Sequence, residues 1–265
     1  MTNGGTMIEQ TMTQLKQLRL GVFAQALREQ LESTQYAELS FEERLSMLVD
    51  RECLERDNRR KKRLVKNAQL KHHPTLEDID FDTPRGLPRA RVMELSQCSW
   101  VKRAHNLIIT GPTGVGKTFL ASAIAKRACA MECTARYGKT AEFVRQLIIA
   151  KHDGSYPKLM AKLSRIQLLV CDEWLRDPLT AEQAREVLDL LDERFRRAST
   201  VFVSQLPVKE WHRMISDPTI ADAVLDRVVH DSHRIELAGE SMRKHTAKIN
   251  SPEGLTGGTS LRSDL

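Results

Sequence analysis

The sequence predicts an α/β fold in which a parallel five-stranded sheet is flanked by helices and is preceded by a small all-helical domain. Residues 104–249 alternate short apolar runs with helical stretches, which is typical of a parallel sheet covered by helices on both faces. A glycine-rich loop at residues 111–118 follows one apolar run and precedes an Ala-rich helix. Residues 1–75, in contrast, carry apolar residues at helical spacing and no strand pattern.

Length and composition leave room for one large domain or two. The chain has 265 residues, of which 41% are hydrophobic, and no run of 18 uncharged apolar residues is present, so we expect no membrane-spanning helix and no membrane partner. The first residues lack the basic start and apolar stretch of a secretory signal. Five cysteines, an odd number without C-x-x-C spacing, are typical of a reduced protein. We therefore expect a cytoplasmic location.

The N-terminal region, residues 1–75, is expected to form a helical domain. Gly21 is a candidate break between two helices, because the apolar spacing continues on both sides of it. Ser40-Phe41-Glu42-Glu43 has the Ser-x-x-Glu pattern of a capping box, which predicts the start of a long helix. The apolar side of that helix is expected to carry Leu45, Leu48, Val49 and Leu54. His72-His73-Pro74 is expected to end it.

The far part of this long helix is strongly basic. Residues 56–71 contain eight of the 41 Lys and Arg residues of the chain and one of its 35 acidic residues, so this segment accounts for the net charge of +6. Like charges at this density repel one another unless a polyanion relieves them, and the duplex DNA backbone is the natural candidate. A merely solvated helix face is the alternative. The expected DNA-binding residues are Arg59, Arg60, Lys61, Lys62, Arg63 and Lys66.

The remaining chain divides into a connector, a sheet domain and a tail. Residues 76–103 contain several Pro and Gly residues and are expected to connect the helical domain to the sheet domain at 104–249. The expected strands are residues 107–110, 134–137, 166–171, 200–204 and 234–237. Thr180-Ala181-Glu182-Gln183 is a second capping box and predicts a helix to about Arg197. Residues 250–265 are rich in Gly, Ser and Thr, and we expect a disordered tail.

The glycine-rich loop fits the phosphate-binding pattern G-x-x-x-x-G-K-[ST]. Glycines allow backbone N–H groups to surround an anion, and the following helix N-terminus adds partial positive charge. Lys117 is expected to reach the β- and γ-phosphates of ATP and Thr118 to hold Mg²⁺. The expected nucleotide-binding residues of the loop are Gly111, Pro112, Thr113, Gly114, Val115, Gly116, Lys117 and Thr118.

Two adjacent acids follow the apolar run 168–171. Asp172 is expected to bind Mg²⁺, through water, and Glu173 to act as the general base that polarises the attacking water. A phosphate-binding loop with an acidic pair at a strand end favours an ATPase over a kinase or a passive binder. The strand at 200–204 ends in Ser204-Gln205, and a polar side chain there is expected near the γ-phosphate.

The order of these features resembles the IstB-like ATPases, which are transposition helpers of insertion sequences within the AAA+ group that includes the helicase loader DnaC. Telling motifs are Ser204-Gln205-Leu206-Pro207-Val208, Asp226-Arg227 and Gly239-Glu240-Ser241-Met242-Arg243. The resemblance implies an AAA+ domain that hydrolyses ATP with Mg²⁺. It also implies a ring or spiral of identical subunits on duplex DNA, which stimulates an IstA-like transposase.

The same resemblance implies roles for single residues. Lys117 and Thr118 match Walker A, and Asp172 and Glu173 match Walker B. Ser204 falls at the first sensor position, with Gln205 as a competitor; Arg243 falls at the second sensor position, and Arg227 matches an arginine finger inserted into the neighbouring subunit's site. Both arginines would stabilise charge on the transferring phosphoryl group. The chain departs from the family pattern at Leu175-Arg176-Asp177-Pro178, where a Gly is usual, so we expect a reshaped loop beside the site.

Two rival functions remain open at this point. A DnaC-like replicative helicase loader shares the ATPase core but needs a helicase and single-stranded DNA, and only 5% of the residues are aromatic for stacking on single strands. A DNA-architectural protein that uses ATP only for assembly would form nucleotide-dependent oligomers without releasing phosphate.

Overall fold

A computed structural model describes residues 3–242 of the chain. It contains two compact units, Met1–Arg63 and Leu64–Leu265. The sequence placed the end of the first domain at residue 75, whereas the structural division falls inside one helix. The division falls there because the end of this helix and the residues after it pack on the core of the second unit through Leu64, Val65, Ala68 and Leu70.

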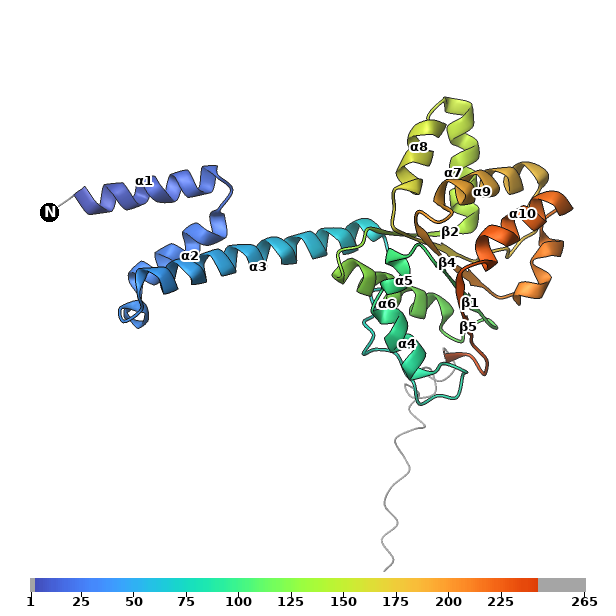
Figure 1. Ribbon diagram of the computed structural model, residues 1–265, viewed down its shortest axis with the longest axis horizontal. Helices are drawn as coiled ribbons and strands as arrows, with labels where there is room; N and C mark the ends of the chain where they lie inside the picture. The colour runs from blue at the N-terminus through green and yellow to red at the C-terminus, as the bar shows by residue number, and fades with distance from the viewer. Residues whose placement is uncertain (1–2, 243–265) are drawn as a thin grey trace, which may run out of the picture. The chain divides into compact units, whose positions relative to one another are not determined.

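The first unit is built from α1 (Asn3–Gln17), α2 (Gly21–Glu32), the 3₁₀ helix η1 (Thr34–Tyr36) and most of α3 (Phe41–Ala68) (Figure 1). The expected break lies at Gly21, which begins α2. The expected capping box is formed: the Glu43 amide donates to Ser40 Oγ at 3.2 Å and the Ser40 amide to Glu43 Oε2 at 2.8 Å. Both hydrogen bonds satisfy N–H groups that a helix start leaves without partners.

The contacts of α2 with α3 are partly polar. Glu52 of α3 is buried and its carboxylate accepts a hydrogen bond from the Phe23 amide at the start of α2. Leu48, one turn earlier, is buried as expected. The other three residues expected on the apolar side of α3, Leu45, Val49 and Leu54, are exposed. The prediction of buried residues on this helix is therefore correct only for Leu48.

The end of α3 comes earlier than the sequence suggested. The helix ends at Ala68 because Gln69 takes a left-handed conformation (φ 51°), and the expected stop at residues 72–74 was therefore wrong by about one turn. A non-glycine residue rarely adopts this conformation, and no Gly or Pro marks the position. Leu70 then turns back into the core of the second unit.

The second unit contains one parallel sheet with strand order β2-β3-β4-β1-β5 among the described residues. This confirms the predicted five-stranded parallel sheet. The strands are β1 (Asn106–Thr110), β2 (Ala135–Lys139), β3 (Leu168–Asp172), β4 (Ser199–Ser204) and β5 (Ser232–Glu236). Each predicted run overlaps one of these strands. The first strand lies between the fourth and the fifth, so β1 and the loop after it are in the interior of the sheet, next to the edge strand β5.

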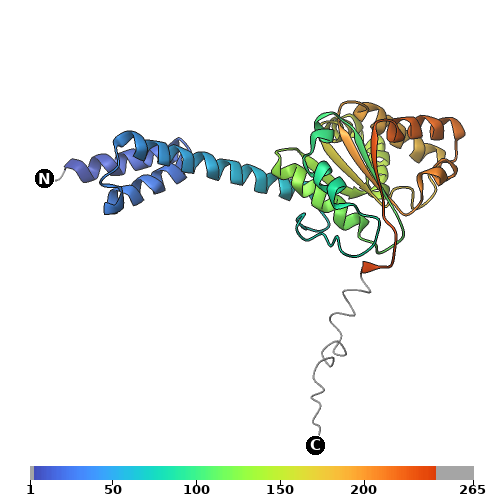
Figure 2. The same cartoon turned by 60° about the horizontal axis from the view of Figure 1, so that its bottom comes forward.

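Helices cover both faces of this sheet, as Figures 1 and 2 show. Successive strand residues alternate between two cores: Leu107 and Ile109 pack on one side, and Ile108 packs on the other. The first core is covered by α4 (Arg89–Ser96), α5 (Ser99–Lys102) and α6 (Lys117–Ala130). The second is covered by α7 (Thr140–Asp153), α8 (Tyr156–Ser164), α9 (Ala181–Arg194) and α10 (Pro218–Val229).

Further elements complete the second unit. The second capping box forms at Thr180 and Gln183 and opens α9. Residues 76–103, expected as a connector, include α4 and α5 and bury Trp100 in the first core. Two 3₁₀ helices, η2 (Val208–Glu210) and η3 (His212–Met214), follow β4. Over residues 3–242, the helices are all too short or too polar to cross a membrane.

Candidate functional site

The glycine-rich loop connects the end of β1 to the start of α6, in the strand–loop–helix setting that the motif requires. Gly111 has φ 142°, and a Cβ there would lie 2.1 Å from the Leu237 carbonyl oxygen. Gly116 caps α6 with φ 95°, and a Cβ there would lie 2.6 Å from Arg85 Nη1. Gly111 therefore requires glycine for space as well as for conformation, and Gly116 requires it for its left-handed conformation.

Lys117 lies in the first turn of α6 and its side chain folds back over the loop. Its Nζ donates hydrogen bonds to the carbonyl oxygens of Gly111 and Pro112, both at 2.7 Å. Burial lowers the pKa of Lys117, and the nearby Asp172 opposes that shift in part. A buried ammonium that donates to two neutral carbonyls is well suited to bind an anion in the loop.

Asp172 is the last residue of β3 and lies opposite the loop. It is buried, and its Oδ2 accepts hydrogen bonds from Thr118 Oγ1 at 3.0 Å and from the Tyr137 hydroxyl at 2.5 Å. Thr140, at the start of α7, donates to the Asp172 carbonyl oxygen at 3.0 Å. Burial, followed by the bond to Asp172, raises the pKa of Tyr137, which therefore stays a neutral donor. Several groups thus fix the orientation of one carboxylate.

These oxygen atoms fit a magnesium ion bound together with a nucleotide. A hydroxyl and a carboxylate oxygen, from Thr118 and Asp172, are ligands of the kind that Mg²⁺ prefers. The described residues contain no group of three or more His, Cys, Asp or Glu side chains that could hold a metal ion. The remaining ligands would therefore be water and phosphate oxygens, as is usual for Mg²⁺ at nucleotide sites.

Glu173 follows β3 in a left-handed conformation (φ 55°), which is uncommon for a residue with a side chain. Both of its carboxylate oxygens are engaged. Lys139 Nζ, at the end of β2, lies 3.0 Å from Oε1, and Arg176 Nη1 lies 2.5 Å from Oε2. Arg176 thus places a cation directly on the predicted general base.

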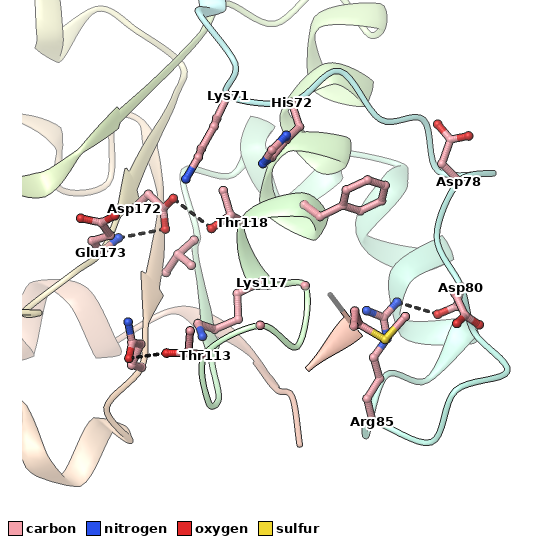
Figure 3. Close-up of a pocket in the computed structure, with 16 residues that line it drawn as sticks. Lys71, His72, Asp78, Asp80, Arg85, Thr113, Lys117, Thr118, Asp172 and Glu173 are labelled. Atoms are coloured by element: carbon pink, nitrogen blue, oxygen red, sulfur yellow. Dashed lines mark hydrogen bonds between the residues drawn. The ribbon is translucent and has the colours of Figure 1, made fainter. Parts of the chain in front are cut away.

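The loop and the acidic pair line one cavity of about 710 Å³, a size typical of ligand sites. Figure 3 shows Lys117, Thr118, Asp172 and Glu173 around it. The opposite wall comes from residues before the sheet, which sequence reasoning did not assign to the site. They are Lys71, His72, Asp78, Asp80 and Arg85.

Ser204 and Gln205 differ in where they point. The buried Ser204 hydroxyl donates to the Trp174 carbonyl oxygen at 2.8 Å, behind the acidic pair. Gln205 lines the cavity, and its Oε1 accepts a hydrogen bond from Thr113 Oγ1 at 2.7 Å. Of the two side chains considered for the sensor position, the structure brings Gln205 to the loop.

Arg227 lies at the other edge of the sheet. Its carbonyl oxygen accepts a hydrogen bond from Asn106 Nδ2 at the start of β1, while the phosphate-binding loop follows the end of that strand. Its side chain pairs with Asp192 of α9. Arg243, the predicted second sensor, lies outside the described residues, as does the predicted tail at 250–265.

The predicted DNA-binding residues all lie on α3. Arg59, Arg60, Lys62, Arg63 and Lys66 are exposed, and Lys61 is half-buried. Arg59 pairs with Glu55 one turn earlier, at 2.8 Å. Five consecutive basic positions surround a helix, so one face can present only part of the set.

The sequence carried little signal for the residues it missed. Tyr137 is a core aromatic by pattern, and its hydroxyl reaches Asp172 only because β2 pairs with β3. Arg85 is buried; its Nη1 donates to the Val115 carbonyl oxygen in the loop at 3.0 Å. Its position between Pro84 and Gly86 resembles an ordinary turn in the sequence.

Known proteins resemble this chain over most of its length. The family model described as IstB-like ATP binding protein matches residues 13–250. An insertion sequence ATP-binding protein of Sinorhizobium fredii is 38% identical over 235 residues, which is 89% of this chain and 96% of the relative. The IS1162 ATP-binding protein of Pseudomonas fluorescens is 40% identical over 202 residues, which is 76% of this chain and 87% of the relative.

Solved structures support the fold. The crystal structure of DnaI matches 68% of this chain and 92% of its own, with a TM-score of 0.53 and 18% identity. DnaA of Aquifex aeolicus, bound to AMPPCP, matches 68% of this chain and 56% of its own, with a TM-score of 0.54 and 16% identity. These structures share the P-loop AAA+ architecture of a parallel sheet between helices, and the family match covers both units. The chain belongs to the IstB-like ATP binding proteins of insertion sequences.

Proposed function

We propose that this protein is an ATPase that assembles on duplex DNA and assists the transposase of its insertion sequence. The observation that carries the proposal is the common cavity of the phosphate-binding loop, Thr118, Asp172 and Glu173. Such a cavity contains the groups needed both to hold a triphosphate and to activate water.

The proposed reaction is hydrolysis of the terminal phosphate of ATP. Lys117 would exchange its bonds to the Gly111 and Pro112 carbonyls for bonds to the β- and γ-phosphates. Thr118 and Asp172 would hold Mg²⁺, which neutralises charge on the phosphates. Glu173 would accept the proton of a water molecule whose oxygen attacks the γ-phosphorus as the bond to the leaving ADP oxygen breaks.

Gln205 is our choice for the group that orients the water or a γ-phosphate oxygen. Its side-chain amide is already held against the loop by Thr113, whereas the Ser204 hydroxyl is used elsewhere. A preorganised amide aimed at developing charge is an established way to stabilise such a transition state. The second-sensor role of Arg243 remains part of the proposal.

Duplex DNA would bind along one side of α3. Arg59, Lys62, Arg63 and Lys66 are spaced at i, i+3, i+4 and i+7, so they share a helix face, and all are exposed. Side chains of this kind contact phosphates without reading sequence, which gives binding that falls steeply with salt. The names of the relatives, which refer to insertion sequences, support DNA transposition as the setting.

Assembly would complete the catalytic site. Arg227 lies at the edge of the sheet opposite the loop, so its proposed role requires a second copy of the chain to bring it to a nucleotide. Its present partner, Asp192, would be exchanged for a phosphate. ATP would then hold a ring or spiral together, and hydrolysis would loosen it after the transposase has been engaged.

The test combines ATP turnover with particle size. Purified protein is given ATP and Mg²⁺ with and without duplex DNA, and phosphate release and mass are measured for the wild type and Glu173→Gln. We expect DNA-stimulated turnover in the wild type, and large assemblies without turnover in the variant. Arg227→Ala is expected to lose turnover. Mixing it with Glu173→Gln subunits should partly restore turnover, because some sites then combine an intact Glu173 from one subunit with an intact Arg227 from its neighbour.

Other outcomes have clear meanings. Assembly without phosphate release in the wild type would favour the architectural protein. A requirement for single-stranded DNA or a helicase would favour the loader. A protein that remains monomeric with ATP and duplex DNA would exclude the role of Arg227.

A further inference from the structure

Lys71 joins the basic helix to the nucleotide cavity along the chain. Helix α3 ends at Ala68, which is fully buried, and Leu70 is 6% exposed in the same core. Lys71 follows at once and lines the cavity. Figure 3 shows its ammonium group directed toward the side of the cavity where Asp172 and Thr118 meet.

The charges around the cavity leave a role for this group. Lys117 bonds to two loop carbonyls, and Arg85 bonds to the carbonyl oxygens of Val115 and Asp80. Within residues 3–242, no hydrogen bond or ion pair engages the Lys71 ammonium. A triphosphate brings several negative charges beside Asp172 and Glu173, and a compact, mobile ammonium is suited to bind them.

The attachment of Lys71 makes it sensitive to the helix. Two residues, Gln69 and Leu70, separate it from the last turn of α3, and buried side chains stand on both sides of Gln69. A shift of that turn would therefore move Lys71 relative to the cavity. Two ligands whose binding depends on the same element influence each other's affinity by the same factor.

We propose that Lys71 binds the terminal phosphates of the nucleotide and thereby links nucleotide binding to DNA binding by α3. The phosphate contact depends only on the nucleotide cavity. The link to DNA rests on the proposed function, because it requires duplex DNA on the basic face of α3.

The first experiment measures nucleotide affinity without DNA. Fluorescent, non-hydrolysable ATP and fluorescent AMP are titrated into the wild type, Lys71→Met and Lys66→Met, with Mg²⁺ present. Lys66 is the matched control, since it is an exposed lysine of α3 outside the cavity lining. We expect Lys71→Met to weaken triphosphate binding about tenfold, as for the loss of one charge-assisted hydrogen bond, and to leave AMP binding unchanged. Lys66→Met should bind both as the wild type does.

The second experiment measures the link. The affinity for duplex DNA is determined for each variant without the ATP analogue and with a concentration of the analogue that saturates that variant. In the wild type the analogue should strengthen DNA binding, and Lys71→Met should bring that ratio close to one. Lys66→Met should weaken DNA binding while it keeps the ratio.

The outcomes separate this inference from the function on which it rests. Wild-type triphosphate affinity in Lys71→Met would overturn the phosphate contact and leave the ATPase proposal intact. Weakened triphosphate binding with an unchanged DNA ratio would overturn the link. Failure of the wild type to bind triphosphate or DNA would instead overturn the proposed function. Equal thermal unfolding of all three proteins ensures that no result reflects misfolding.

Discussion

Replacement of Arg176 by Ala should increase ATP turnover. In the structure Arg176 contacts Oε2 of Glu173 while Lys139 contacts Oε1, so a water molecule must compete with a cation at each oxygen of the proposed general base. Removal of one clamp should raise the fraction of molecules in which Glu173 can accept a proton. The Arg176 side chain is about half exposed, and exposed ion pairs shift equilibria only modestly.

The expected increase follows from that exposure. Pairs of this kind change a population by about two- to fivefold, so kcat should rise by about the same factor. The assay is steady-state phosphate release at saturating Mg²⁺ and ATP, with duplex DNA absent and then present. DNA should stimulate the variant less than the wild type if DNA normally releases the same clamp.

The chain offers a matched control. Arg213 and Glu210 form a similarly spaced i,i+3 pair at 2.6 Å, away from the cavity lining, so Arg213→Ala should leave turnover unchanged. Combining Arg176→Ala with Glu173→Gln should give no increase. A decrease in kcat for Arg176→Ala would refute the reasoning, because it would mean that Arg176 holds Glu173 in its productive position.

Three further predictions concern the metal ligand, the core and the thiols. Tyr137→Phe should raise the Mg²⁺ concentration for half-maximal turnover about tenfold, because Asp172 loses an orienting bond; an unchanged magnesium titration would exclude that role. Arg194→Leu should lower the free energy of unfolding by about 3 kcal/mol in urea denaturation, since a buried guanidinium that donates to carbonyls around it is lost; a shift below about 1 kcal/mol would contradict this. Burial raises the pKa values of Cys98 and Cys129 to about 11, from an ordinary value of 9.0. Because the folded state retains these protons longer, their contribution to stability is complete below pH 9 and is lost between pH 9 and 11. The melting temperature under reducing conditions should therefore fall across that window, and less steeply in Cys129→Ala.

The centre of the site could be predicted because its signals are local in the sequence. The loop, Lys117 and Thr118 form one continuous motif, and the acids stand directly after a buried run. Parallel strands end on the same side of a sheet, so an acid at the end of β3 and the loop after β1 lie on that side, with β4 between the two strands. The five strands were recognised by their apolar runs for the same reason.

Other features depend on contacts that no short pattern records. The insertion of β1 between β4 and β5 is a property of the whole sheet. The wall containing Lys71 and Arg85 depends on how the segment before the sheet packs against α6, where Lys126 donates to the His73 carbonyl oxygen at 2.7 Å. The clamp on Glu173 requires left-handed conformations at both Glu173 and Leu175, which bring Arg176 back onto the carboxylate. Residues other than glycine rarely adopt this backbone conformation, so sequence preferences argue against it.

The backbone of the segment that follows β5 is hydrogen-bonded to the nucleotide loop and to the stretch before the sheet. Leu237 donates to the Thr110 carbonyl oxygen at 2.8 Å, and Met242 donates to that of Gly114 at 3.0 Å, while Ala238 donates to Arg85 at 2.9 Å. Three stretches that are far apart in the sequence are thus hydrogen-bonded to one another, and glycines leave the space that this close packing needs. A change in the shape of the loop when a ligand binds would therefore displace residues 237–242 through these backbone hydrogen bonds. Sequence drift is constrained in the same way: a bulkier residue in one stretch requires the others to yield, so these positions should change together or not at all.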